Sequence, residues 1–162
     1  MSPRAAARLE TLGFTKVYDY VNGKADWLAA GLPSEGPSAE VTTAGDAVRG
    51  GDIVCHLGER LGDSLERMRV ADKDVCIVVD DRHVVLGRVR GRVLSGDPNA
   101  AIEDVMQSGP STIRADIPLD AVVETLRDGN VSSTLVTDPE GRLIGALYLE
   151  DSERKLAKWD GS

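Results

Sequence analysis

Three arginines that alternate with smaller residues have the chemistry of an anion-binding group. Arg88, Arg90 and Arg92 are separated by Val89 and Gly91. On an extended strand this spacing places all three guanidinium groups on one face. Their forked donors suit phosphate oxygens. A solvated strand face that pairs with nearby carboxylates is the other interpretation, and we favour it for the stripe as a whole.

The histidines and cysteines do not have the spacing of a metal site. Cys55 and His56 are adjacent, so on a strand they point to opposite faces, and neither Cys76 nor His83 completes a short ligand pair. We therefore predict no metal. Both cysteines lie in apolar strand patterns, which indicates reduced, buried thiols in a cytoplasmic protein. A disulfide between them is the alternative and depends on their geometry. Motifs of phosphate loops, nucleophile elbows and catalytic triads are absent from the sequence, which favours a protein that is not an enzyme.

The elements that must position these residues form a repeat. Residues 135–151 predict a strand, a turn at 138–141 where proline presets φ and glycine takes the left-handed position, a return strand and a helix start. The pattern occurs once earlier, and Gly145 lies 58 residues after Gly87. The same offset relates the apolar faces of two predicted helices, so we expect two β-α-β-β repeats, 42–94 and 100–152, joined by the linker 95–99.

The size and the charge of the chain limit the range of possible functions. The chain has 162 residues, 41% of them hydrophobic, and a net charge of −8. This charge disfavours a nucleic-acid partner, because affinity for nucleic acid depends largely on neutralising phosphates. The sequence contains neither an apolar run long enough to span a bilayer nor a signal peptide, so we expect no membrane contact. One repeat of about 50 residues buries too little surface to be comfortably stable alone, so the pair is the expected folding unit.

The first forty residues have a different pattern. Ser2 and Pro3 suit a helix start, and Gly13 a helix end. A short strand over 16–21 and a short helix over 24–30 are predicted next. Residues 34–41 have the composition of a linker.

The two repeats resemble a tandem pair of cystathionine-β-synthase (CBS) domains, also called a Bateman module. The resemblance rests on EDVMQSGPSTI and PLDAVVETLRDGNVSSTLVTDPEGRLIGALYLED, with weaker counterparts in 42–94. It implies an α/β fold with pseudo-twofold symmetry. It also implies a regulatory module that binds an adenosine-containing ligand, AMP, ADP, ATP or S-adenosylmethionine, in the cleft between its sheets.

Residues 1–33 resemble the last third of a rhodanese domain, on SPRAAARLETLGF, VYDY, NGKADW and LAAGLP. Such domains carry a catalytic cysteine just before the helix that begins here at Pro3. This chain has no cysteine before Cys55, so the nucleophile for sulfur transfer is missing. We expect a short α/β rhodanese-like appendage without activity, or a truncated form of a longer sulfurtransferase.

The CBS resemblance also implies site residues, chiefly in the second repeat. Asp151 stands where the family has the acid that accepts hydrogen bonds from ribose, although an acid at a helix N-terminus also serves as a cap. Tyr148 and Arg90 stand where the family has a small hydroxyl residue near phosphate, whereas Val93 replaces the ribose acid in the first repeat. Strand residues expected near adenine are Thr112, Ile113, Ser132, Ser133 and Thr134, although small hydroxyl residues also simply fit a half-buried strand.

Three functions remain open from the sequence. The first is a non-enzymatic regulatory module that senses an adenosine ligand through the second repeat. The second is a ligand-free module for dimerisation or protein interaction; a homodimer is expected under either of these two. The third is part of a rhodanese-type sulfurtransferase with CBS regulation. The stretch 153–162 is expected to form a C-terminal helix or tail.

Overall fold

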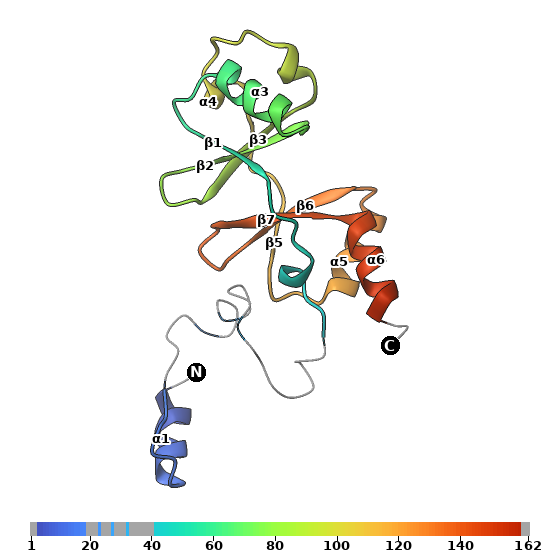
Figure 1. Ribbon diagram of the computed structural model, residues 1–162. Helices are drawn as coiled ribbons and strands as arrows, with labels where there is room; N and C mark the ends of the chain where they lie inside the picture. The colour runs from blue at the N-terminus through green and yellow to red at the C-terminus, as the bar shows by residue number, and fades with distance from the viewer. Residues whose placement is uncertain (1–2, 19–22, 24–26, 28–31, 33–40, 160–162) are drawn as a thin grey trace.

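From Thr42 onward the chain folds as two similar halves (Figure 1). The computed structural model describes residues 3–18, 23, 27, 32 and 41–159. The elements of the first half are η2 (Gly45–Ala47), β1 (Ile53–His56), α3 (Leu61–Val70), β2 (Val75–Val79), β3 (Val85–Arg90) and η3 (Gly91–Ser95). Those of the second are α4 (Ile102–Val105), β4 (Gln107–Ser108), β5 (Thr112–Arg114), α5 (Leu119–Asp128), β6 (Ser133–Thr137), β7 (Leu143–Tyr148) and α6 (Leu149–Trp159).

The sequence offset of 58 residues is also the structural offset. It relates α3 to α5, β2 to β6 and β3 to β7 residue by residue. Each sheet has a parallel pair followed by an antiparallel strand, in the orders β1-β2-β3-β4 and β5-β6-β7. The short β4 comes from the second half and pairs with β3 of the first. Even the irregularity in strand register recurs, between Val78 and Val79 and between Val136 and Thr137. The predicted α/β fold with two repeated sheets is therefore confirmed.

Local sequence explains the repeated elements. In α5 the buried residues Leu119, Val122, Val123 and Leu126 recur at spacings of three and four, so one face of the helix packs on the core. In the turn between β6 and β7, the Asp138 carboxylate accepts hydrogen bonds from the backbone N–H groups two and four residues later, at 3.0 and 2.8 Å. The left-handed position of this turn is occupied by a glycine.

The two halves exchange their first segments. Ala44 N–H donates to the Ile117 carbonyl at 2.8 Å, and Ala44 is buried in the core beneath α5. Its counterpart Ile102 donates to the Glu59 carbonyl at 3.0 Å and is buried in the core beneath α3. Each half therefore completes the hydrophobic core of the other, and the pair is one folding unit.

Glycines permit the close approach of the exchanged segments. A Cβ on Gly87 would lie 2.7 Å from Met106 Sδ and 2.9 Å from the Gln107 carbonyl oxygen. A Cβ on the equivalent Gly145 would collide with Val48 Cγ1. Larger side chains at the two glycines would separate each sheet from the segment that crosses to it.

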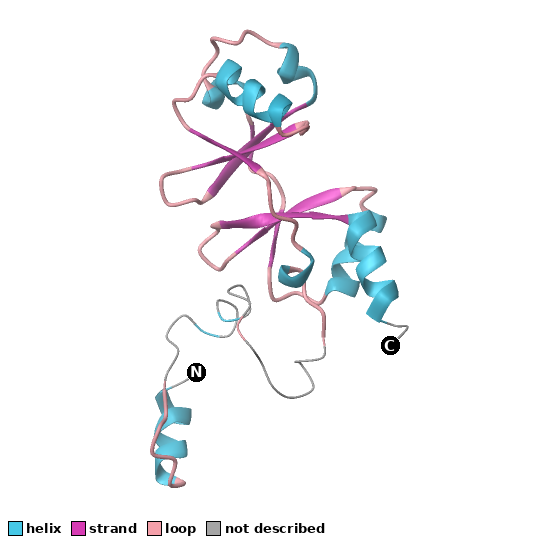
Figure 2. Cartoon of the chain, viewed as in Figure 1, coloured by secondary structure: helices cyan, strands magenta, loops and turns pink. Residues whose placement is uncertain are grey.

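The two sheets face each other across a third apolar cluster, with the helices on their outer sides (Figure 2). Ile77 and Val79 of the first sheet meet Leu135 and Ala146 of the second. Paired backbone hydrogen bonds close one end of this interface: Val85 N–H to the Gly141 carbonyl, and Leu143 N–H to the His83 carbonyl, at 3.0 and 2.9 Å. These two bonds exchange places under the 58-residue offset, so they lie about the pseudo-twofold axis.

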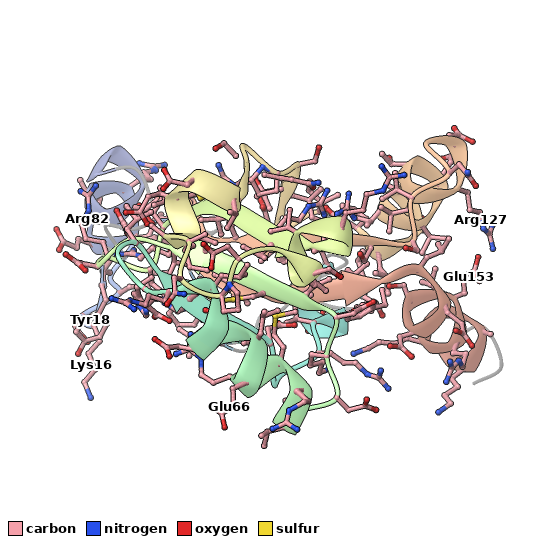
Figure 3. All side chains as sticks on the ribbon, turned by 90° about the horizontal axis from the view of Figure 1, so that it is seen from above. Lys16, Tyr18, Glu66, Arg82, Arg127 and Glu153 are labelled. Atoms are coloured by element: carbon pink, nitrogen blue, oxygen red, sulfur yellow. A yellow bond between two sulfur atoms is a disulfide. The ribbon has the colours of Figure 1, made fainter. Side chains whose placement is uncertain are left out.

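Helix α6 has no counterpart of equal length in the first half. It packs beside α5, and Arg127 Nη2 lies 2.6 Å from Glu153 Oε1 at their outer edge (Figure 3). The equivalent position in the first half is the short η3. Among the described residues, no helix is both long and apolar enough to cross a membrane.

The N-terminal region fits the sequence expectations only in part. Helix α1 (Pro3–Thr11) forms as expected. Residues 16–18 are not strand, so that part of the predicted strand 16–21 is wrong. The rest of it, and nearly all of the predicted helix 24–30 and linker 34–41, lie outside the described residues.

Two predictions about side chains are corrected. Arg92 does not extend the arginine stripe, because β3 ends at Arg90 and Gly91, with φ +68°, turns the backbone into η3. Cys55 and Cys76 are not free thiols but form a disulfide, with their Cα atoms 6.3 Å apart. They lie on the adjacent parallel strands β1 and β2, and both are fully buried.

Candidate functional site

A narrow pocket lies between the two sheets and draws its walls from both halves. Its apolar lining comprises Ile53, Val75 and Ile77 from the first half and Leu135 and Ala146 from the second. The volume open to the centres of water-sized molecules is about 40 Å³. Because one water needs ~10–15 Å³ by this measure, the pocket in this state has room for a few waters.

The polar lining is unequal between the halves. The second half contributes two hydroxyl groups, from Ser133 and Tyr148. The first half contributes the charged side chains, which are Asp52, Lys73, Asp74, Arg88 and Arg90. A planar ligand between the apolar walls would therefore meet hydroxyls at one wall and charges at the other.

Pseudo-symmetry explains this arrangement. Arg88 is equivalent to Ala146, and Arg90 is equivalent to Tyr148, yet all four line the same pocket. Part of the pocket therefore lies between equivalent strand positions of the two halves, where the same backbone carries different side chains. Asp52 adds to the difference, because the equivalent position in the second half is a proline.

Tyr148 is held as a neutral hydrogen-bonding group. Burial raises the pKa of the Tyr148 phenol, and the negative charges of Asp52 and Asp74 raise it further. The hydroxyl therefore keeps its proton at neutral pH and can both donate and accept. Asp52 is itself fixed in place, because its Oδ2 accepts the Ala146 N–H at 2.8 Å.

Arg88 is the unusual charge in the pocket. Burial lowers the pKa of its guanidinium, and the positive charge of Arg90 lowers it further. Arg90 Nε donates to Gln107 Oε1 at 3.3 Å and has no carboxylate partner among the described residues. The Arg88 guanidinium nevertheless remains charged at neutral pH, because an arginine does not deprotonate in proteins.

Comparison with known proteins identifies the architecture. Residues 102–151 match the family model of the CBS domain. The solved CBS-pair protein CBSX2 from Arabidopsis thaliana superposes with a TM-score of 0.66 at 21% identity, covering 75% of this chain and 99% of that one. The fold is that of a CBS pair. No curated protein matches the sequence.

Two further structures with this fold were solved with ligands. The CBS pair of protein MJ0100, in complex with 5-methylthioadenosine and S-adenosyl-L-methionine, has a TM-score of 0.60 at 20% identity and covers 73% of this chain and 98% of that one. The cytosolic domain of the Mg²⁺ channel MgtE, in complex with ATP, has a TM-score of 0.64 at 23% identity and covers 73% of this chain. This chain spans only 51% of that domain, and 48% of a second magnesium-transporter structure.

The comparisons do not support the rhodanese resemblance of residues 1–33. The family model covers residues 102–151 only, and the two CBS-pair structures show the fold of a CBS pair. The described part of the predicted rhodanese-like strand is not extended into a sheet. The rhodanese-like appendage is therefore not shown by these findings.

The CBS pair brings three of the eight predicted site residues into the pocket. Arg90, Ser133 and Tyr148 line it. The predicted residues that do not line it are Thr112, Ile113, Ser132, Thr134 and Asp151. Thr112 and Ser132 are exposed, whereas Thr134 is buried and its Oγ1 donates to the Ser111 carbonyl at 3.4 Å. Ile113 packs at the margin of the core beneath α5.

Asp151 is close to the pocket but is engaged elsewhere. Its carboxylate lies 3.2 Å from Arg49 Nη1 and 3.6 Å from Arg154 Nη2, with 21% of the side chain exposed. Its negative charge also contributes to the raised pKa of the Tyr148 phenol. A ligand that uses Asp151 must therefore compete with two arginines, one of which comes from the first half.

Sequence reasoning missed most of the charged lining. Asp52, Lys73 and Asp74 stand at the starts of strands, where polar residues are common, so they gave no separate signal. Arg88 was noticed only as part of the arginine stripe. The 58-residue offset was the usable signal, because it maps Arg88 onto Ala146 within a repeated strand and so marks a charge at a position that is apolar in the other half.

Proposed function

We propose that this chain is a regulatory CBS pair that binds an adenosine-containing ligand, AMP, ADP, ATP or S-adenosylmethionine, in the inter-sheet pocket. The observation that carries the proposal is the pocket itself, which has apolar walls from both halves and a few convergent polar groups. Two proteins of the same fold were solved with ATP and with adenosyl ligands, which supports this class of ligand. CBS pairs are generally regulatory, which supports a role without catalysis.

The pocket suggests a role for each lining group. Ile77 and Leu135 provide apolar surfaces on which a purine can lie. Ser133 and Tyr148 offer hydroxyl groups to the base or the sugar. Asp151 is the proposed ribose acceptor, once the ion pair with Arg49 opens. Contacts therefore come from both halves, which differs from the expectation that the second repeat would dominate.

Binding must open the pocket. Space for a few waters is far smaller than a nucleoside, so the two sheets or the side chains between them must move apart. A ligand that binds only the open state shifts the balance between closed and open states toward the open one. This coupling is how occupancy of the pocket would be signalled to a partner.

Titration calorimetry and thermal shift with the four candidate ligands test the proposal. We expect saturable binding to the wild type by at least one of them and weaker binding to Asp151→Ala. Glu150→Ala is the matched control, because Glu150 is an acid of the same helix turn whose side chain is exposed, whereas Asp151 is partly buried and acts on Tyr148. If none of the four ligands binds, the proposal is refuted. Equal binding to wild type and Asp151→Ala refutes only the role of Asp151.

The closed pocket favours one alternative, a ligand-free interaction module that forms a homodimer. Light scattering combined with the same ligand screen separates the two functions. A dimer that responds to none of the ligands supports the interaction module. Ligand binding supports the regulatory module, whether or not the chain is dimeric.

A further inference from the structure

The pocket contains a cationic end built from one half only. Lys73, Arg88 and Arg90 line it, and all three belong to the first half. Their counterparts under the 58-residue offset are Val131, Ala146 and Tyr148, none of which carries a charge at neutral pH. The wall from the second half is apolar or hydroxylic, so the two walls of the pocket differ in charge.

The two acids of the pocket offset only part of the charge of the three cations. Asp52 directs one carboxylate oxygen at the Ala146 N–H, 2.8 Å away. Asp74 is exposed. Among the described residues neither acid forms an ion pair with Lys73, Arg88 or Arg90, so these cations have no direct carboxylate contact inside the pocket.

Arg88 is a pocket cation whose side chain is half-buried. Within the described part of the chain, this side chain makes no hydrogen bond or ion pair. Arginines elsewhere behave differently: Arg127 and Arg154 each lie 2.6 Å from a carboxylate oxygen. The chain has 27 acidic and 19 basic residues, so carboxylates are abundant, yet no carboxylate of the described residues forms an ion pair with Arg88.

A half-buried guanidinium without a partner loses hydration and gains nothing in return. That loss is recovered when an anion occupies the pocket, because charge-assisted hydrogen bonds to a guanidinium are short and strong. Arg90 is two residues along β3, on the same face, so both forks can reach one phosphate group or two linked ones.

We propose that Arg88, with Arg90 and Lys73, selects a ligand that carries phosphate, so that the pocket prefers adenine nucleotides to adenosine and to the cationic S-adenosylmethionine. This inference rests on the proposed function for the adenosine part of the ligand. The phosphate lies toward the first half, and the nucleoside lies toward Ser133 and Tyr148. The preference is specific to this half, because the second half has alanine at the position of Arg88.

Calorimetry with adenosine, AMP, ADP, S-adenosylmethionine and inorganic pyrophosphate tests the inference. We expect AMP or ADP to bind at least tenfold more tightly than adenosine. Arg88→Ala, which reproduces the residue of the second half, should weaken nucleotide binding by about ten- to a hundredfold, the range for a lost charge-assisted contact. Binding of adenosine should change less than twofold.

Two further variants keep the result interpretable. Arg90 is exposed, so Arg90→Ala should fold normally and should also weaken nucleotide binding. Arg92→Ala removes the same charge from an exposed residue that does not line the pocket, and it should bind nucleotides like the wild type. Circular dichroism checks that each variant is folded.

The outcomes separate this inference from the proposed function. Equal affinities for adenosine and AMP, or nucleotide binding unchanged in folded Arg88→Ala and Arg90→Ala, overturn the phosphate assignment and leave adenosine binding intact. A third outcome is pyrophosphate binding that depends on Arg88, with no binding of adenosine and no higher affinity for AMP or ADP than for pyrophosphate. That outcome supports the anion site and refutes the adenosine ligand. If AMP, ADP and pyrophosphate all fail to bind, the inference is refuted.

Discussion

Reduction of the Cys55–Cys76 disulfide should weaken the first half measurably. The bond joins the neighbouring strands β1 and β2 and closes a loop that contains α3, with a sequence separation of 21. The chain-entropy relation for a loop of this length gives a stabilisation of about 3 kcal/mol. Because typical domains are stable by only ~5–15 kcal/mol, losing this amount should be obvious in equilibrium unfolding.

Urea unfolding with and without a phosphine reductant measures the effect. Both sulfurs are fully buried, so the reduced samples should be unfolded in reductant and then refolded. We expect the midpoint to fall and the dependence of the unfolding free energy on urea to rise somewhat, because the unfolded chain expands once the cross-link is lost. The double variant Cys55→Ala/Cys76→Ala should unfold at the same midpoint with and without reductant.

Two results would refute the reasoning. One is a pair of titratable thiols in protein that has been unfolded without reductant, because the bond would then not exist. The other is an intact bond, verified by a mass increase of two hydrogens on reduction, whose loss leaves the unfolding free energy unchanged.

Two other perturbations test the packing and the charges. Gly87→Ala and Gly145→Ala should each lower the unfolding free energy, measured by urea unfolding, by about 1–3 kcal/mol, because the added Cβ meets the crossing segment. Gly50→Ala is the control and should be nearly neutral, because the space around Gly50 is open. Equal effects at all three positions would contradict the proposed close approach. The pKa of Asp138 also makes stability depend on pH. Burial opposes its ionisation, but hydrogen bonds from Arg142 and the turn backbone outweigh burial and lower its pKa below 3.8. Its stabilisation is therefore present above about pH 4 and is lost as the pH falls through the folded pKa. Asp138→Asn should be less stable than the wild type at pH 6, and the difference should shrink at pH 3; a difference that grows on acidification would refute this assignment.

The repeat was predictable from sequence because its signals are local. Apolar spacing in the helices, the turn around Asp138 and the paired glycines Gly87 and Gly145 each follow from nearby residues, and the constant offset connected them. The exchange of Ala44 and Ile102 between the halves was not predictable. Periodicity indicates that a residue is buried, but it does not indicate in which of two similar cores the residue lies. The disulfide between Cys55 and Cys76 was not predictable for a related reason. A separation of 21 residues does not give the distance between the two cysteines until their strands are known to be adjacent.

The site was predictable only where the family pattern and the pocket coincide. Tyr148, Ser133 and Arg90 were found by their positions in the repeat. Arg88 was undervalued, because an arginine on a strand is ordinarily a surface residue and burial depends on the facing sheet. The ion pairs that hold Asp151 involve Arg49 from the other half, a long-range contact that no local pattern contains.

The crossing of Ala44 and Ile102 has a consequence for how such a protein can be divided. A polypeptide that stops in the connector 95–99 would have a gap in its core where Ile102 belongs, and a surplus segment around Ala44 with nothing to dock against. Two copies of that fragment could fill the gap by placing the segment around Ala44 of each copy in the core of the other, as in a domain-swapped dimer. A single repeat would therefore need a second molecule to complete its core, and joining two repeats in one chain makes that encounter independent of concentration.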